Sequence, residues 1–506
     1  MKRFHTAAWL GLTSAAFLVL LSPAWAQQDS SAGQAGAAPA STDQSSGAPP
    51  AATGPSAGPD IENPPLSGLD QPTSEPAYGG RSYLVPGIQV SEAVDASSSG
   101  LTSKLAGTNE VAQGLGSLDL QKIWKKYQLG LDYIAGGTVF QGHVNQPHLG
   151  NSYQVHTLAT DQRILWRTGQ LAFRDSFNYL PEGTFGYGSF GGAGGFSSAL
   201  GGGTTGGVGA GTGLGGGITG GIPGGTFGGG QIGSLGIQPR INNLTIVDVT
   251  QSLSPRSTIV IAAGYDYTHF FSNALTSLPL INSQMSSAQI GYDYLLNRHD
   301  RISALYAYQS IHFPSSGSGT VDAHLWHFLY GHRISGRLNM VVGGGPQLII
   351  FHSPLIAVPN QLSGSGRAQL SYQLRSRTSA QLTYMHYVTP GSGFFAGANT
   401  DVARASMNQL MGHNWSFNAD IGYSHNSQLQ ASALGASAAK TYDYWYGGTS
   451  IRRQLGRYFG AFVSYQYSDI RFNTSVCTVP GTCATSQARN VGLVGIDWHP
   501  HPFRLD

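Results

Sequence analysis

The sequence has little charge and no long apolar run. Asp, Glu, Lys and Arg make up 10% of its 506 residues, against about 25% in an average soluble protein. No stretch after the N-terminus approaches the roughly 18 consecutive apolar residues of a membrane-spanning helix, so no such helix is expected. The net charge of +2 implies no nucleic acid or other polyanion as partner. Few charges together with 71 Gly and 24 Tyr favour a membrane β-barrel.

Cysteine and catalytic motifs are also scarce. The two cysteines, Cys477 and Cys483, enclose Thr-Val-Pro-Gly-Thr. Such a close pair on a Pro-Gly loop of an exported chain predicts a local disulfide. A metal or redox pair is the alternative, but no second pair completes a metal site. There is no Gly-x-Ser-x-Gly or His-Glu-x-x-His motif, and no stretch argues for a Ser/His/Asp site at a barrel rim. We therefore expect no enzyme activity, metal or cofactor.

The N-terminus has the pattern of a signal peptide. Lys2 and Arg3 precede an apolar stretch from Ala7 to Leu21, and Ala24-Trp25-Ala26 is a cleavage site of the A-x-A type. An uncleaved membrane anchor is the alternative, disfavoured because the apolar stretch is short for a span. Residues 1–26 are thus predicted to be removed on export.

The next hundred residues contain no clear strand pattern. Residues 27–80 are rich in Ala, Ser, Gly and Pro and contain six acidic residues but no Lys or Arg. Such a composition cannot form a core and predicts a disordered linker. Residues 81–126 are more apolar but have no sustained period, which leaves a periplasmic extended segment or a partial plug as alternatives.

From Tyr127 onward the sequence alternates between apolar and polar residues. In the stretch from Gly366 to Tyr387, Leu370, Tyr372 and Leu382 alternate with Gln, Ser and Thr on both sides of a three-residue interruption. This period of two predicts an antiparallel hairpin with one apolar and one polar face. Sixteen such strands are predicted for residues 127–506, beginning near Tyr127, Tyr153, Gln170, Ile241, Thr258, Gln284, Arg301, Asp322, Leu338, Gly366, Thr378, Asp401, Trp415, Thr441, Arg457 and Ala488.

Short and long connections alternate between these strands, as periplasmic turns and extracellular loops do in outer-membrane barrels. Arginines gather at the short turns, at positions 256, 298, 337, 375, 377, 453 and 457. The fold class is therefore all-β: a transmembrane antiparallel up-and-down β-barrel of about 16 strands. The low content of Lys and Glu on the polar faces argues against the alternative, a soluble all-β protein.

The polar face should line a wet lumen, while the apolar face with its aromatic residues near the strand ends meets lipid. Each lining residue either only stabilises the wall by hydrogen bonds or tunes which solutes pass. The predicted lining residues are Asp132, Asp266, Asp293, Arg367, Gln369, Gln373, Gln381, Asn418, Asp420 and Gln466.

Two other features carry no site. The Gly-rich loop within 183–240 lacks any strand-helix context for nucleotide binding, and it is expected at the surface, with folding into the lumen as the alternative. Three histidines lie close in sequence, but His324 and His327 point to opposite faces of a strand, which argues against a metal site with His332.

The repeated amphipathic hairpins, the run Leu338–Pro346 (LNMVVGGGP) and the final strand Arg489–Trp498 resemble bacterial outer-membrane β-barrel proteins of the porin-like kind. The resemblance covers about residues 127–498. Unlike many such barrels, which end on an aromatic residue read by the assembly machinery, this chain continues to Asp506.

The resemblance implies location in the cell outer membrane, with its lipid bilayer and assembly machinery as partners, and leaves the oligomeric state open. It implies a passive channel for small polar solutes, or a pore that exports a surface polymer such as a polysaccharide. A non-conducting structural or surface-display barrel is the alternative function.

Overall fold

The computed structural model describes residues 66–67, 82–97, 107–142, 152–180, 240–271, 280–314, 319–353, 358–375, 378–391, 393–412, 414–430, 439–479 and 482–505. The chain divides into two compact units, Met1–Thr53 and Gly54–Asp506. All described residues belong to the second unit. The predicted signal peptide and almost the whole predicted Gly-rich loop lie outside the described residues.

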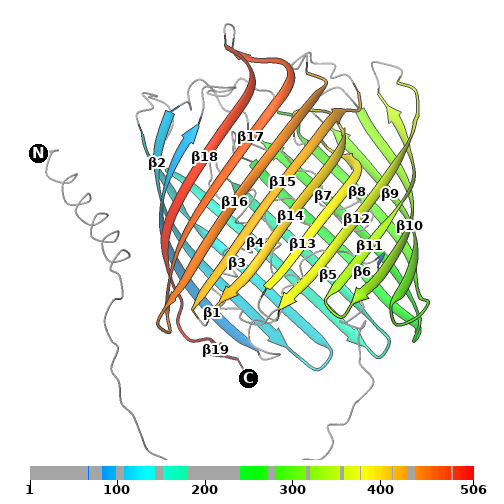
Figure 1. Cartoon of the computed structure of the whole chain (residues 1–506), viewed down its shortest axis with the longest axis horizontal. Helices are drawn as coiled ribbons and strands as arrows, with labels where there is room; N and C mark the ends of the chain where they lie inside the picture. Colours follow the sequence, from blue (N-terminus) through cyan, green and yellow to red (C-terminus); the bar gives the residue numbers. More distant parts are fainter. Residues whose placement is uncertain are drawn as a thin grey trace, which may run out of the picture. The chain divides into compact units, whose positions relative to one another are not determined.

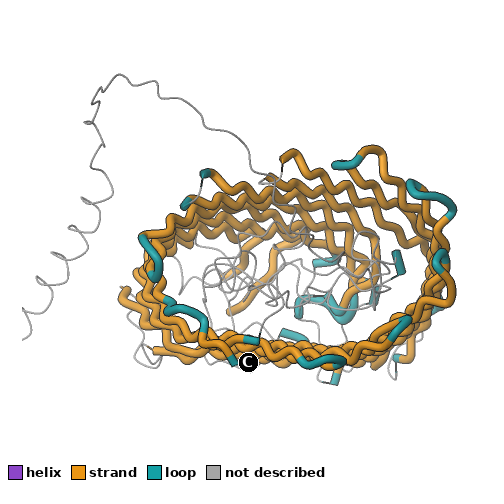
Figure 2. Tube along the Cα trace, turned by 90° about the horizontal axis from the view of Figure 1, so that it is seen from below, coloured by secondary structure: helices purple, strands orange, loops and turns teal. Residues whose placement is uncertain are grey.

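The described residues form nineteen strands in one antiparallel sheet (Figure 1). Strands β1 to β17 each pair with the next strand, and β18 pairs with β1, so the sheet closes into a barrel (Figure 2). The short β19 adds to the start of β1. The predicted closed up-and-down barrel is confirmed. The strands are β1 Tyr83–Ser97, β2 Gly107–Ile123, β3 Tyr127–Gly142, β4 Ser152–Trp166, β5 Gly169–Leu180, β6 Arg240–Ser254, β7 Ser257–Phe270, β8 Ser283–Leu295, β9 Asp300–Phe313, β10 Gly319–Ser335, β11 Leu338–His352, β12 Gln361–Arg375, β13 Thr378–Thr389, β14 Ala398–Met411, β15 Trp415–Gln428, β16 Thr441–Leu455, β17 Phe459–Val479, β18 Thr482–Trp498 and β19 Phe503–Arg504.

The predicted count of about 16 strands is wrong, because β1 and β2 belong to the barrel wall. The sequence predicts an extended segment or a partial plug for residues 81–126, yet β1 pairs with β18 along one edge and with β2 along the other. Apolar and polar residues alternate in β1, but Pro86 and Glu92 interrupt its apolar side. In β2, Gly114 and Gly116 take positions on the outward side and leave it with few apolar side chains. The sixteen other strands are all found, the largest error being the start of β18 at Thr482 rather than Ala488. Among the residues that the structure describes, no helix is long and apolar enough to cross a membrane.

The wall of the barrel has its apolar side outward. On β8, Ile290 and Tyr292 are 49% and 45% exposed, whereas the flanking Gln289 and Asp293 are 4% and 8% exposed. The same arrangement recurs on β10, where Trp326 and Phe328 are exposed and His327 is buried. A protein dissolved in water would place these faces the other way round. An apolar outer face with a polar inner face is what a bilayer outside and water inside require.

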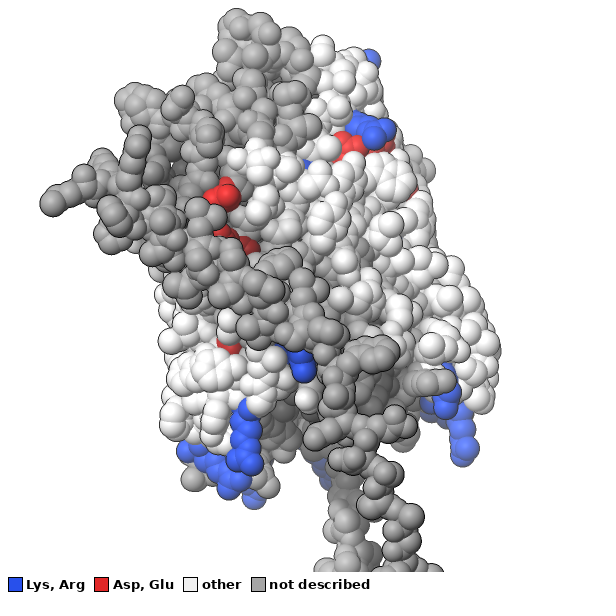
Figure 3. All heavy atoms as spheres, turned by 60° about the vertical axis from the view of Figure 1, so that its left-hand side comes forward, with Lys and Arg blue, Asp and Glu red and all other residues white. Residues whose placement is uncertain are grey.

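Charges gather at the barrel end formed by the short turns, which we call the short-turn rim. Lys125, Arg167, Arg256, Arg298 and Arg337 lie in these turns, and Figure 3 shows Lys and Arg along the lower edge with few charges on the wall above. The predicted gathering of arginines at short turns is thus found at Arg256, Arg298 and Arg337. We call the opposite end, where the longer connections lie, the long-loop rim.

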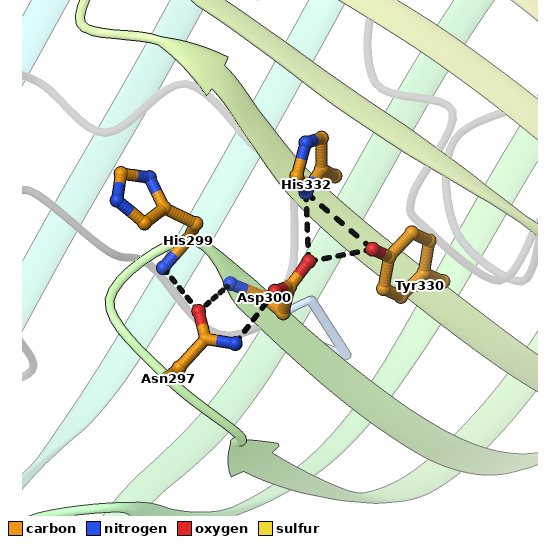
Figure 4. Close-up of polar contacts among 5 residues, drawn as sticks. All are labelled: Asn297, His299, Asp300, Tyr330 and His332. Atoms are coloured by element: carbon orange, nitrogen blue, oxygen red, sulfur yellow. Dashed lines mark hydrogen bonds and ion pairs between the residues drawn. The ribbon is translucent and has the colours of Figure 1, made fainter.

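Clusters of Tyr, His and Asp lie on the outer face near both rims. At the short-turn rim, Asp300 Oδ1 accepts a hydrogen bond from Tyr330 at 2.5 Å and lies 2.7 Å from His332 Nδ1, while Asn297 closes the turn beneath (Figure 4). Two clusters of the same form lie toward the long-loop rim: Tyr384, His386 and Asp401, and Tyr423, His425 and Asp443. In each, the Asp is directly opposite the His on the neighbouring strand. Such amphipathic groups are enriched where apolar wall meets headgroups, so they delimit the apolar band.

The three histidines of β10 meet different partners. His324 lies outward, with Nδ1 2.9 Å from the Tyr306 hydroxyl, and His332 joins the Asp300 cluster. His327 lies inward and bonds to Ser365. The predicted opposite placement of His324 and His327 is found.

Candidate functional site: the inner wall of the barrel

Most predicted lining residues alternate with outward apolar neighbours. Asp266, Asp293 and Arg367 are buried on the inner side, and Gln381 is exposed beside the outward Leu382. The side chain of Asp420 lies outside the described part of the chain, although its backbone lies in β15. The half-buried members of the set are Asp132, Gln369, Gln373, Asn418 and Gln466.

Ion pairs that sequence reasoning missed lie on the inner side of β4 to β6. Arg174 lies 2.9 Å from Asp248, and Arg163 lies 2.7 Å from Asp161. Asp161 is directly opposite Arg174, so the four charges form a continuous ladder across three strands. Because both signs alternate, the ladder can hydrogen-bond polar solutes without selecting strongly for one charge.

Arg367 is the centre of a second polar group on the inner side. Its Nη2 donates to Gln369 Oε1, and Gln369 Nε2 in turn donates to Ser371 Oγ at 3.3 Å. Ser365, two residues before Arg367, bonds to His327 of β10. The alternation of Ser365, Arg367, Gln369 and Ser371 with apolar residues is the signal that places Gln369 and Arg367 on this side.

The connection between β13 and β14 folds into the barrel. Gly391, Gly393 and Gly397 have φ of 83°, 84° and 85°, which a residue with a side chain rarely adopts. The Gly393 carbonyl accepts a hydrogen bond from Ile281 N at 2.8 Å, and the Gly397 carbonyl accepts one from Leu429 N at 3.1 Å. We call residues 390–397 the inner loop. The sequence predicts one of the long outer loops here, and the structure instead packs it against the inner wall.

Aromatic side chains attach the inner loop to the wall. The ring centroid of Phe394 lies 5.5 Å from that of Tyr442 and 5.3 Å from that of Phe472, and Phe395 lies 5.3 Å from Tyr442. Phe395 and Tyr442 are fully buried. Tyr442 belongs to the inner face of β16, because its neighbours Asp443 and Trp445 face outward with the Tyr423 cluster. An apolar core therefore narrows the lumen near the long-loop rim.

Leu66 and Ser67, which precede the barrel strands in sequence, lie against the inner wall. Ser67 N donates to Asp293 Oδ1 at 3.1 Å, Ser67 Oγ donates to Asp293 Oδ2, and Gln289 Nε2 donates to the Ser67 carbonyl at 3.0 Å. Leu66 and Ser67 are 4% and 0% exposed. These two residues lie within the predicted linker of residues 27–80, and the buried carboxylate of Asp293 supplies hydrogen-bond partners that composition cannot reveal.

The side chains of the predicted disulfide, Cys477 and Cys483, lie outside the described part of the structure, but the backbone register of their strands is described. Cys477 of β17 is directly opposite Cys483 of β18. Directly opposed residues of antiparallel strands have Cα atoms about 4.5–5.5 Å apart, which a disulfide can bridge. We expect the mature protein to contain this bond, and mass spectrometry under non-reducing conditions should find a peptide lighter by two hydrogens. Two free thiols would contradict it.

Comparisons with known proteins give remote likenesses among solved structures. No family model and no curated protein matches the chain. Among solved structures, Pseudomonas aeruginosa OpdK with vanillate is 9% identical over 82% of this chain and 99% of its own, with a TM-score of 0.40. Pseudomonas aeruginosa OprD is 9% identical over 85% and 99%, with a TM-score of 0.40, and Acinetobacter baumannii OccAB3 is 11% identical over 83% and 99%, with a TM-score of 0.38. Likenesses at these values say nothing about the solutes of this chain, so its function is inferred from the barrel itself.

Proposed function

We propose that the chain is an outer-membrane channel for the passive passage of small polar solutes. The observation that carries the proposal is the closed wall with apolar residues outward and ion pairs and amides inward. Closure satisfies the backbone hydrogen bonds of every barrel strand, which a bilayer demands. The outer face then meets lipid, and the inner face keeps water and solute.

The inner loop limits the size of solutes that pass, and the polar wall offers them hydrogen bonds. The loop around Phe394 and Phe395 narrows the passage, which excludes large polymers such as an exported polysaccharide. The Arg174–Asp248 and Arg163–Asp161 pairs offer donors and acceptors to a solute that has lost part of its water. The predicted lining residues Asp266, Gln369, Asn418 and Gln466 contribute to the same wet surface.

Liposome swelling tests this proposal. Vesicles containing the purified, refolded protein should admit a disaccharide and exclude a large dextran, because the narrowed lumen passes only small polar molecules. Vesicles that exclude both solutes would contradict the channel.

A non-conducting barrel is the second candidate, because two segments fill part of the lumen. The inner loop forms a buried apolar core with β16 and β17, and Ser67 hydrogen-bonds to Asp293. In that case neither solute would enter, although the protein would show the heat-modifiable gel mobility of a folded barrel.

A further inference from the structure

We propose that Asp293 and Gln289 form a binding site for a peptide unit with a neighbouring hydroxyl, and that the chain's own Leu66–Ser67 occupies it as an internal ligand. The inference rests on the proposed function and names the solute class that can compete for the site. It concerns a part of the wall that neither the ion-pair ladder nor the inner loop includes.

The polar contacts match one peptide unit. The two oxygens of Asp293 accept from the backbone N–H and the hydroxyl of Ser67, and the Gln289 amide donates to the Ser67 carbonyl. The two hydrogen bonds that the carboxylate accepts offset part of the free-energy cost of burying its charge. Asp293 and Gln289 are four residues apart on β8, so both side chains project from the same face of one strand.

Gly291 and Gly331 lack side chains where Leu66 and Ser67 pack against the wall. A Cβ at Gly291, which lies between Gln289 and Asp293, would overlap the Ser67 side chain. A Cβ at Gly331 of β10 would lie 3.0 Å from Leu66 Cδ2 and would also press on Arg301. The recess is thus shaped for main chain with one small polar and one apolar side chain, which is a peptide segment.

The segment reaches this site although Ser67 lies 226 residues away in sequence from Asp293. Because Leu66 and Ser67 belong to the same chain as the site, they bind it as a tethered ligand, at a higher effective concentration than a dilute free solute. A free solute therefore has to compete with a tethered ligand. A peptide-like solute therefore binds this site only when it displaces Leu66 and Ser67.

The site is tested with a variant that lacks residues 54–80 and a labelled peptide of residues 60–72, DIENPPLSGLDQP. Fluorescence anisotropy should show saturable binding of the peptide to the folded deletion variant and weaker binding to the full chain, whose site is occupied. In the deletion background, Asp293→Asn and Gly291→Ala should each weaken binding about tenfold or more, as expected for losing a hydrogen bond to a charged group or the space for Ser67. Gly364→Ala is the matched control, because a Cβ there meets no atom within 4 Å.

Conductance gives a second readout. The deletion variant should conduct more than the full chain, and adding the peptide should lower its conductance again. Equal peptide binding to the deletion variant with and without Asp293→Asn, or no binding at all, would overturn the inference even if the channel conducts. Peptide binding to a barrel that never conducts would instead overturn the proposed function and leave the site intact.

Discussion

Replacing Leu370 by Lys is expected to prevent most of the protein from forming the barrel, whereas Lys at the next residue, Ser371, is expected to be tolerated. Leu370 of β12 is 37% exposed on the apolar outer face, and Ser371 faces inward in the hydrogen-bonded row with Gln369. A Lys facing the bilayer midplane costs about 2–4 kcal/mol, while a Lys in the lumen keeps its water. Heat-modifiable gel mobility of membrane fractions measures the folded share of each variant.

Ile421 and Asn418 of β15 provide an independent pair. Ile421 is exposed on the outer face, and Asn418 donates to Ser450 on the inner face at 3.4 Å. Lys at Ile421 should again reduce the folded share far more than Lys at Asn418. Equal tolerance of both faces in both pairs would mean that the outer face does not meet lipid.

Removing residues 392–396 from the inner loop is expected to raise the single-channel conductance clearly above that of the wild-type protein. The deletion takes Phe394 and Phe395 out of the lumen, while β13 and β14 keep their paired positions from Thr378↔Gln409 to Thr389↔Ala398. Loss of the buried Phe395 destabilises the barrel by about 3–5 kcal/mol, judged from Phe→Ala substitutions in protein cores. Single-channel recording of the refolded variant measures the step size.

The control for this deletion is Ile246→Ala. Ile246 is buried on the inner wall of β6 beside Ala262 and belongs to a different cluster from the inner loop. Its truncation lowers stability by about 2–5 kcal/mol without opening the passage. Conductance steps that grow equally in both variants would show that loosening of the wall, rather than removal of the loop, opens the pore.

Sequence alternation is sufficient to predict a strand and its lipid-facing side where the two faces of the strand differ clearly in polarity. On β12, Leu370 and Tyr372 alternate with Gln369 and Ser371, and the lipid-facing side can be assigned without a structure. On β1 the outward Ile88, Val90 and Val94 are interrupted by Glu92, which hides the strand from a search for alternation. The barrel closes where β1 pairs with β18, which places Ile88 opposite Trp498. These residues lie far apart in sequence, so no local sequence pattern predicts this pairing.

Contacts inside the lumen are the least predictable part of the site. Phe394 and Phe395 lie between glycines in a stretch with no period, which is typical of an outer loop. Leu66 and Ser67 lie in a polar, proline-rich stretch, and only the position of Asp293 on the facing wall explains their burial. The ladder of Asp161, Arg174 and Asp248 escapes sequence analysis because these three charges lie on different strands, and only the register between strands brings them together.

Planar-bilayer recording of the purified wild-type protein tests the central claim most directly, namely that a water-filled passage runs through the barrel. Such a passage predicts discrete conductance steps, smaller than those of the variant lacking residues 392–396. A correctly folded wild-type protein that inserts into the bilayer and gives no steps, together with a silent deletion variant, would contradict the claim.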